Sequence, residues 1–162
     1  SGIRCKAINL GDSQVYSRRN VILNWDEELK RLVPTNLGGN MSAKDHLSRY
    51  ADGWMKGDLE TILSSVSNDY VFDDPNEGQI TKEKLPTYMG QLKEVVSSLR
   101  GTESETQFME LSEIVTQEEE DGLTAWCWWE IPGTEIKGSG LIKVGPEGVR
   151  SERLTYYTKL SS

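Results

Sequence analysis

The stretch from Ser42 to Pro75 constrains the fold of this chain more than any other. Its first part repeats apolar residues at the spacing i, i+3, i+4 and i+7, namely Leu47, Tyr50, Ala51 and Trp54. This spacing places them on one side of a helix and predicts a buried stripe. Ser42 and Asp45 match the pattern of a capping box at its start, and Gly57 is suited to the left-handed residue that ends a helix.

The second part of the stretch predicts a short helix followed by a strand. Asp58 is a suitable N-cap for a helix over about 59–66. The next residues alternate in polarity, so that Tyr70, Phe72 and Asp74 share one face of a strand. Pro75 ends the strand and begins a turn. The stretch therefore predicts two helices that lead to a carboxylate at the end of a strand.

The rest of the chain predicts one more helix and then a run of antiparallel strands. We expect the helix from about Thr81 to Leu99, with a first turn distorted by Pro86. Turn residues separate the predicted strands, which cover 106–116, 123–131, 135–144 and 149–159. This order of elements predicts an α+β fold in which three N-terminal helices pack on a strongly curved, mostly antiparallel sheet.

The length and charge of the chain set limits on its domains and partners. We expect one domain over 42–160, preceded by a partly flexible extension over 1–41 with a short helix at about 24–33. A formal net charge of -8 argues against nucleic acid and anionic membranes as partners, because phosphate groups need a basic surface. No apolar run approaches the roughly 20 residues that a membrane-spanning helix needs.

The histidine and cysteine content argues against a metal site. Two cysteines and one histidine cannot supply four zinc ligands of these types, and two cysteines do not make a disulfide framework. Cys127 lies in an apolar strand and is predicted to be a buried, inert thiol. This favours the cytoplasm or another reducing compartment, and a trimmed, organelle-targeted form stays open. His46 is expected to be exposed and is not a candidate base.

The tryptophan-rich strand from Leu123 to Ile131 has large apolar side chains on both faces. Trp126 and Trp128 point to one side, whereas Cys127 and Trp129 point to the other. Both faces should therefore be buried. If helices cover one face, the other is covered most simply by a second copy, so we expect a homodimer through the sheet.

Three segments of the chain occur in an order that is typical of one superfamily: Y-A-D-G-W-M-K-G-D-L-E-T-I-L at 50–63, N-D-Y-V-F-D-D-P at 68–75 and G-L-I-K-V-G-P-E-G-V-R-S-E-R-L-T-Y-Y at 140–157. Together they resemble the cone-shaped nuclear transport factor 2-like superfamily, and within it the SnoaL-type polyketide cyclases and ketosteroid isomerases. The resemblance implies a hydrophobic pocket for a small apolar molecule and no cofactor. It implies acid–base isomerisation or cyclisation of an apolar carbonyl compound. A non-catalytic ligand-binding or dimerisation module of the same fold stays open as the alternative.

The resemblance also implies three catalytic positions. Asp74 falls where ketosteroid isomerases have their general base, Tyr50 where they have the tyrosine that donates to the oxyanion, and Tyr88 where a second tyrosine supports it. The second acid of those enzymes would fall near Gly140, and this chain has no acid there. From the residues alone, Asp74 could equally be an Asp-Pro turn residue, and both tyrosines could be core residues.

The remaining candidates are wall residues of the predicted pocket. We expect the ligand to contact five side chains that share a face with the catalytic candidates or with one another: Trp54, Phe72, Trp126, Trp128 and Glu130. Glu130 could instead belong to a frayed strand end. On the last strand, Glu152 shares a face with Tyr156, and Arg153 lies on the other face. Cross-strand salt bridges are the ordinary explanation for charged residues at such positions.

Overall fold

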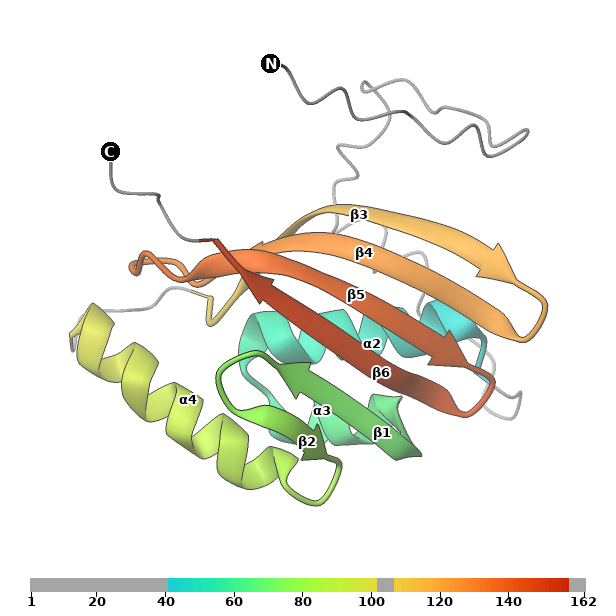
Figure 1. Ribbon diagram of the computed structural model, residues 1–162, viewed down its shortest axis with the longest axis horizontal. Helices are drawn as coiled ribbons and strands as arrows, with labels where there is room; N and C mark the ends of the chain where they lie inside the picture. The colour runs from blue at the N-terminus through green and yellow to red at the C-terminus, as the bar shows by residue number, and fades with distance from the viewer. Residues whose placement is uncertain (1–40, 102–106, 158–162) are drawn as a thin grey trace, which may run out of the picture.

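The computed structural model describes residues 41–101 and 107–157. The predicted extension, including its helix at 24–33, lies outside this part of the chain except for Met41. The described residues form three helices and one six-stranded sheet, which confirms the α+β class (Figure 1). None of the helices in these ranges combines the length and the hydropathy that crossing a bilayer requires.

The first helix, α2 (Ala43–Lys56), begins and ends as the sequence predicts. The side chain of Ser42 accepts a hydrogen bond from the backbone N–H of Asp45, and the Asp45 carboxylate accepts one from the backbone N–H of Ser42. Gly57 ends the helix with φ of 67°, a conformation that side chains disfavour. A Cβ at this position would also lie 3.0 Å from the ring of Phe108.

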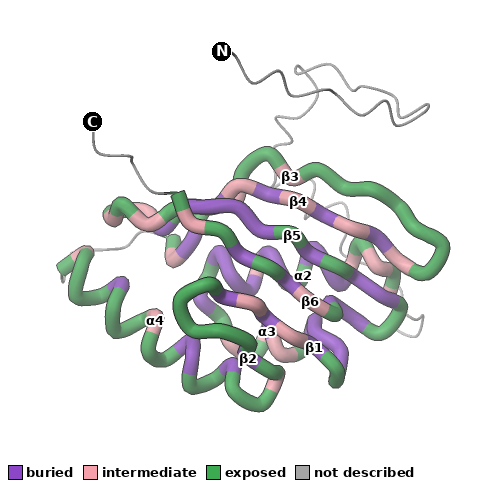
Figure 2. Tube along the Cα trace, in the orientation of Figure 1, coloured by how far each residue is buried: buried purple, intermediate pink, exposed green. Residues whose placement is uncertain are grey.

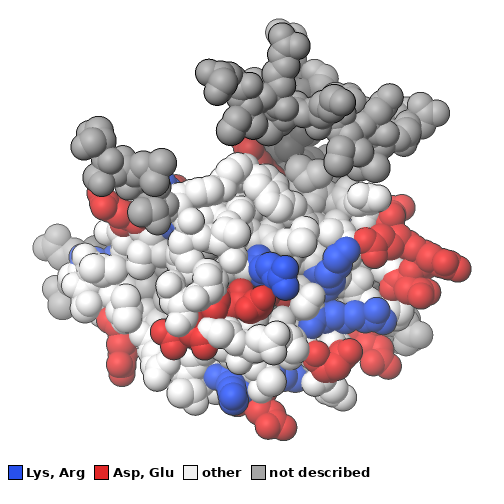
Figure 3. All heavy atoms as spheres, viewed as in Figure 1, with Lys and Arg blue, Asp and Glu red and all other residues white. Residues whose placement is uncertain are grey.

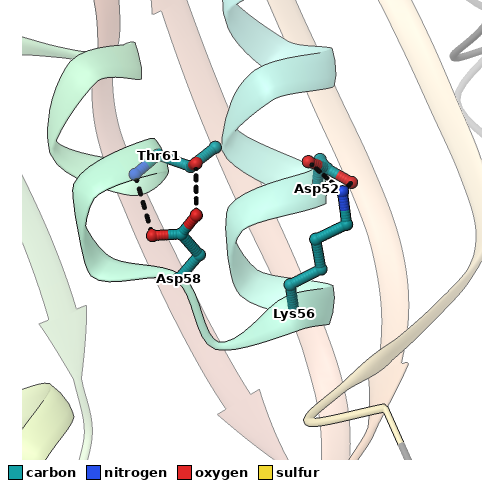
Figure 4. Close-up of polar contacts among 4 residues, drawn as sticks. All are labelled: Asp52, Lys56, Asp58 and Thr61. Carbon is teal, nitrogen blue, oxygen red and sulfur yellow. Dashed lines mark hydrogen bonds and ion pairs between the residues drawn. The ribbon is translucent and has the colours of Figure 1, made fainter.

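A tight corner joins α2 to the second helix, α3 (Leu59–Ser65), and Figure 4 shows the polar contacts around it. The carboxylate of Asp58 accepts hydrogen bonds from the backbone N–H and the hydroxyl of Thr61, at 3.3 and 2.7 Å. Lys56 forms an ion pair of 2.9 Å with Asp52, one turn earlier on α2. Asp58 is therefore the N-cap of α3, as predicted.

The six strands form one curved sheet. Four of its five neighbouring pairs join strands that follow one another in the chain, and the fifth joins the first strand to the last. The strands are β1 (Val66–Asp74), β2 (Gly78–Thr81), β3 (Glu110–Glu119), β4 (Gly122–Glu130), β5 (Lys137–Gly145) and β6 (Gly148–Tyr156). Their order across the sheet is β2-β1-β6-β5-β4-β3. All neighbours are antiparallel except β1 and β6, which pair in parallel. This pairing places the first long strand beside the last one.

The third helix, α4, differs from the prediction in its position relative to the strands and in the residue at which it begins. It follows β1 and β2 in the chain, so only α2 and α3 precede the sheet. It covers Leu85–Arg100, because residues 78–81 pair with β1 as β2 and are not available as a first helical turn. Pro86 therefore lies within the first turn of α4, where its missing N–H removes no helical hydrogen bond. The predicted distortion at Pro86 is wrong for this reason.

The helices cover the concave face of the sheet, and the core lies between the two layers (Figure 1). Helix α2 contacts β3, β4, β5 and β6, while α4 packs near β2 at one end of the sheet. Figure 2 shows buried and more exposed residues alternating along the strands. In β4 the pattern alternates residue by residue, with Leu123, Ala125, Cys127 and Trp129 buried. The alternating side chains between them point to the outer face.

Candidate functional site

An apolar cavity lies between α2, α4 and the concave face of the sheet. Its volume is about 40 Å³, and one ordered water needs on the order of 10–15 Å³. As it stands, the cavity has room for a small chemical group. Eighteen residues of the described ranges line it: Leu47, Tyr50, Ala51, Trp54, Phe72, Tyr88, Leu92, Met109, Leu111, Ile114, Cys127, Trp129, Ile131, Ile136, Ile142, Glu152, Leu154 and Tyr156.

Among the described residues, Glu152 is the one carboxylate in the wall of this cavity. It lies on β6, is 6% exposed, and accepts a hydrogen bond from the hydroxyl of Tyr50 on α2. The Tyr50 oxygen also lies 2.6 Å from the hydroxyl of Tyr70 on β1. These three side chains come from three elements and form one buried hydrogen-bonded chain. Such a chain needs every member in place, because a buried polar group without a partner is costly.

Burial determines which of these hydrogen-bonded side chains carry a proton. Loss of solvent raises the pKa of Glu152 from 4.5 to about 7, although the hydrogen bond from Tyr50 opposes the change. Burial, followed by the negative charge of Glu152, raises the pKa of Tyr50 well above its ordinary value. The phenol therefore stays protonated and donates to the carboxylate. Glu152 can take or release a proton near neutral pH, which is the property that general acid–base chemistry needs.

Glu152 fills the space beside Gly140, where the resemblance places a second acid. A Cβ on Gly140 would overlap Oε1 of Glu152. Gly140 lies on β5 opposite Leu154 on β6, and Glu152 is two residues earlier on that strand. A carboxyl group is thus present at this place after all, and it comes from the neighbouring strand. The absence of a side chain at Gly140 leaves the room that it needs.

The expected salt bridges of the last strand are correct for one residue and wrong for the other. Arg153 pairs with Asp73 across β1 and β6 at 3.1 Å, on the outer face of the sheet. Glu152 makes no ion pair with any residue that the structure describes, because alternation turns it to the concave face among apolar side chains. Its partner there is the neutral phenol of Tyr50.

Asp74 forms a second carboxylate–tyrosine cluster at the edge of the cavity. It is 2% exposed, and one of its oxygens accepts hydrogen bonds of 2.7 Å from the hydroxyls of both Tyr88 and Tyr156. The other oxygen accepts from the backbone N–H of Asn76 at 2.8 Å, which is a turn contact. Burial raises the pKa of both tyrosines, so both donate. The contact with Asn76 agrees with the interpretation of Asp74 as a turn residue.

The cluster faces an outer recess next to the cavity. This recess has a volume of about 350 Å³ and includes Asp74 in its wall. It shares four residues with the inner cavity, which are Tyr88, Leu92, Ile136 and Tyr156. Leu92 and Ile136 are only half buried. These side chains therefore separate the two spaces, and a larger ligand would have to move them to enter the inner one.

The structure brings together some of the predicted site residues and separates others. Tyr50 and Tyr88 both line the cavity, but Asp74 contacts Tyr88 and not Tyr50. Trp54 and Phe72 also line it, with their rings stacked at 5.5 Å between centroids and 22° between planes. They lie on α2 and β1, so the contact joins the helical layer to the sheet.

The other predicted wall residues, Trp126, Trp128 and Glu130, lie on the outer face of β4, and their assignment to the cavity is wrong. The sequence shows which residues of a strand share a face but not which face turns inward. On β4 the inward residues are Cys127 and Trp129. The buried thiol of Cys127 agrees with its prediction, and burial raises its pKa, which keeps it protonated.

The expectation that His46 is exposed is also wrong. Its side chain is 8% exposed, and Nε2 lies 3.2 Å from the carbonyl oxygen of Pro146 in the turn between β5 and β6. His46 does not line the cavity. Within the described ranges, no three His, Cys, Asp or Glu side chains come close enough to hold a metal ion.

Sequence reasoning missed four residues of the site: Tyr70, Trp129, Glu152 and Tyr156. A signal for Glu152 was present, because it shares its strand face with Leu154 and Tyr156, and an acid followed by apolar residues on one face is a candidate for burial. The decisive information was the pairing of β6 with β1 and β5. That pairing brings residues more than 70 positions apart to one place.

Comparison with known proteins identifies the fold. No protein-family model and no curated protein matches the chain. An NTF2-like protein of unknown function from Cytophaga hutchinsonii is 12% identical with a TM-score of 0.53, over 75% of this chain and 95% of that one. A protein of unknown function with a cystatin-like fold from Xanthomonas campestris is 16% identical with a TM-score of 0.53, over 74% and 93%.

A third solved structure carries the name that the sequence segments suggest. A SnoaL-like protein of unknown function from Burkholderia thailandensis is 17% identical with a TM-score of 0.50, and the match covers 72% of this chain and 94% of that one. Sequence identities at this level show a shared fold only, so the chemistry has to be inferred from the residues of the site. These likenesses show that the described residues share the fold of the NTF2-like and SnoaL-like proteins named above.

Proposed function

We propose that this protein binds a small apolar carbonyl compound in the concave cavity, which opens into the outer recess when Leu92 and Ile136 move aside. There it moves a proton on the ligand, as an isomerase or cyclase that needs no cofactor. One observation carries the proposal: a single buried carboxyl group with a pKa of about 7 lies in the wall of an otherwise apolar cavity. Perturbed carboxyl groups in enclosed pockets are typical of acid–base sites.

The proposed step is proton transfer at the carbon next to a carbonyl group. The Glu152 carboxylate takes the proton from that carbon, the C–H electron pair moves into the carbonyl group, and an enolate and a neutral Glu152 result. Glu152 then returns the proton to another carbon of the conjugated system, which gives the isomer. A positioned base contributes on the order of 100- to 10,000-fold to the rate of such a step.

Glu152 takes the role that the resemblance assigns to Asp74. Both oxygens of Asp74 already accept hydrogen bonds, and it faces the outer recess. We propose that Asp74 is a positioning residue, which fixes Tyr88 and Tyr156 at the entrance of the cavity. Tyr50 holds the Glu152 carboxylate in place and lowers its pKa through the hydrogen bond.

Proton exchange on a simple ketone tests this proposal. In D₂O buffer, the hydrogens at C1 of 2-tetralone exchange for deuterium, and NMR follows the loss of their signal. We expect the protein to accelerate the exchange and Glu152→Gln to remove the acceleration. Glu130→Gln is the matched control, because it changes an exposed glutamate on the outer face. Asp74→Asn should keep a part of the acceleration if Asp74 only positions the tyrosines.

Two results would count against catalysis. Acceleration that survives in Glu152→Gln but disappears in Asp74→Asn would return the role of the base to Asp74. Binding of 2-tetralone without acceleration in the unchanged protein would favour the alternative, a ligand-binding module of the same fold. A binding titration followed by NMR on the same samples separates these outcomes.

We propose in addition that the outer face of the sheet pairs with a second copy of the chain. Val115 is 54% exposed and Leu141 is 42% exposed, which is unusual for such large apolar residues in a sheet. Beside them, the rings of Trp126 and Tyr157 both pack on Trp128, with centroids 4.5 and 4.7 Å away. Figure 3 views this side and shows uncharged surface next to groups of both charges.

The oligomeric state tests the pairing. Contiguous apolar patches on a sheet face are typical of interaction surfaces, and two-fold symmetric dimers are the commonest arrangement. We expect a dimer by light scattering after size-exclusion chromatography, and a monomer for Leu141→Glu. A monomer at 100 µM of the unchanged protein would contradict the proposal.

A further inference from the structure

Two tryptophan side chains in the wall of the cavity have buried indole N–H groups without a hydrogen-bond partner. They are Trp54 on α2 and Trp129 on β4, and each is 4% exposed. Among the described residues, three buried side-chain nitrogen or oxygen atoms lack a partner, and the third belongs to His46. Two of the three thus occur in the wall of one cavity. Buried polar groups in native proteins are nearly always paired, so each exception calls for an explanation.

The packing around these indoles explains their positions but offers no acceptor. Trp54 stacks on Phe72 with one face and meets the ring of Tyr50 edge-on. Trp129 meets the ring of Tyr156 edge-on at 5.4 Å. Gly138, opposite Trp129 on β5, leaves the space for the indole, because a Cβ there would lie 2.8 Å from its ring. These contacts are apolar, so the N–H groups are the unused polar atoms of the wall.

The two indoles lie on the same side of the Glu152–Tyr50 pair and at a similar distance from it along their elements. Trp54 is one helical turn beyond Tyr50, which is about 6 Å further along α2. Trp129 is two residues beyond Cys127, about 7 Å further along β4, and Cys127 pairs with Gly140 beside Glu152. Both steps lead towards the end of the sheet where Tyr156 and the outer recess lie. Both indoles therefore lie next to the Glu152–Tyr50 pair, on the side that faces Tyr156 and the outer recess.

The chemistry of the Glu152–Tyr50 pair requires donors of this kind. The Tyr50 hydroxyl donates its hydrogen bond to Glu152, so it is not free to donate to a carbonyl oxygen as the resemblance implied. Deprotonation next to a carbonyl group places negative charge on its oxygen, and donors that are already in position stabilise this charge most effectively. Indole N–H groups donate hydrogen bonds but never accept them.

We propose that Trp54 and Trp129 donate their indole N–H groups to the carbonyl oxygen of the ligand, while Glu152 acts on the carbon beside it. The cavity then selects apolar ring compounds that carry a hydrogen-bond acceptor, and it binds the corresponding hydrocarbon more weakly. This inference rests on the proposed function, because it requires that a ligand enters the cavity.

The test compares two compounds with the same skeleton. 2-Tetralone and tetralin differ by one carbonyl oxygen, and titration of the ¹⁵N-labelled protein gives the affinity of each. We expect 2-tetralone to bind about tenfold more tightly, because a site with buried donors disfavours a ligand that leaves them unpaired. The indole ¹H–¹⁵N signals of Trp54 and Trp129 should move downfield with 2-tetralone and not with tetralin.

Substitutions then assign the preference to the two side chains. Trp54→Phe and Trp129→Phe remove the N–H group and keep an aromatic ring, and each should reduce the preference for the ketone to about twofold. The preference is a ratio measured within one variant, so a general loss of stability does not alter it. Trp126→Phe is the matched control on the outer face of the same strand, and its ratio should stay at about ten.

Each outcome has a defined consequence. Equal affinity for the two compounds in the unchanged protein, or an unchanged ratio in both cavity variants, would overturn the inference and leave the pocket proposal standing. If neither compound binds, both the inference and the proposed function are overturned. If the ketone is preferred but its proton exchange is not accelerated, the indole contacts stand and the proposed catalysis fails.

Discussion

The buried carboxyl group of Glu152 predicts an unusual dependence of stability on pH. Its pKa is about 7 in the folded protein, whereas an exposed glutamate has 4.5. Between these pH values the folded state keeps the proton and the unfolded state releases it. Stability contributed by this group is therefore present below about pH 4.5, falls as the pH rises towards 7, and changes little above that.

The size of this loss follows from the two pKa values. The difference is about 2.5, and each pKa unit corresponds to about 1.4 kcal/mol, so the loss is about 3 kcal/mol. This is a large share of the 5–15 kcal/mol that is typical for a domain. Glu152→Gln removes the titrating group and keeps its approximate shape. The variant should equal the unchanged protein at pH 4.5 and exceed it by about 3 kcal/mol at pH 8.

Urea unfolding at several pH values between 4.5 and 8 measures this difference. All other titrating groups are the same in both proteins, so their effects cancel when the two curves are subtracted. Glu130→Gln, on the outer face, should give a difference that stays constant within about 0.5 kcal/mol. Parallel curves for Glu152→Gln and the unchanged protein would refute the reasoning. A variant that becomes relatively weaker as the pH rises would show that the charged form is the favoured one.

Three further predictions concern single contacts, each measured by urea unfolding. Gly140→Ala should cost about 1–3 kcal/mol because its Cβ displaces the Glu152 carboxylate, whereas Gly90→Ala on α4, with no neighbour within 4 Å, should gain up to about 1 kcal/mol; equal effects would contradict this. Asp74→Ala should cost about 2–4 kcal/mol, since three donors lose their acceptor, and a loss below about 0.5 kcal/mol would show that they find others. Arg100→Met should cost about 1–3 kcal/mol because it breaks hydrogen bonds to the carbonyls of residues 107, 108 and 132; no change would mean that water replaces them.

The local parts of the fold could be predicted from the sequence because their causes are local. The capping box at Ser42, the left-handed Gly57 and the N-cap Asp58 depend on residues within one or two turns. The four strands after α4 were each found within a few residues of their bounds. The short strand β2 was missed, since a segment of four residues between a turn and a helix gives too weak a pattern.

The sequence alone determined the order of the helices and the long strands, the caps of α2 and α3, and the α+β fold with its resemblance to SnoaL-like proteins. The resemblance pointed to Tyr50 and Tyr88, and shared faces of a helix or strand pointed to Trp54 and Phe72; all four line the cavity. Only the tertiary structure decided which face of β4 turns inward and that β6 lies beside β1. Those two facts place Trp129 and Glu152 in the cavity and leave Trp126 outside. The physical reason is that a buried carboxyl group owes its properties to neighbours from distant segments, and periodicity carries no information about them.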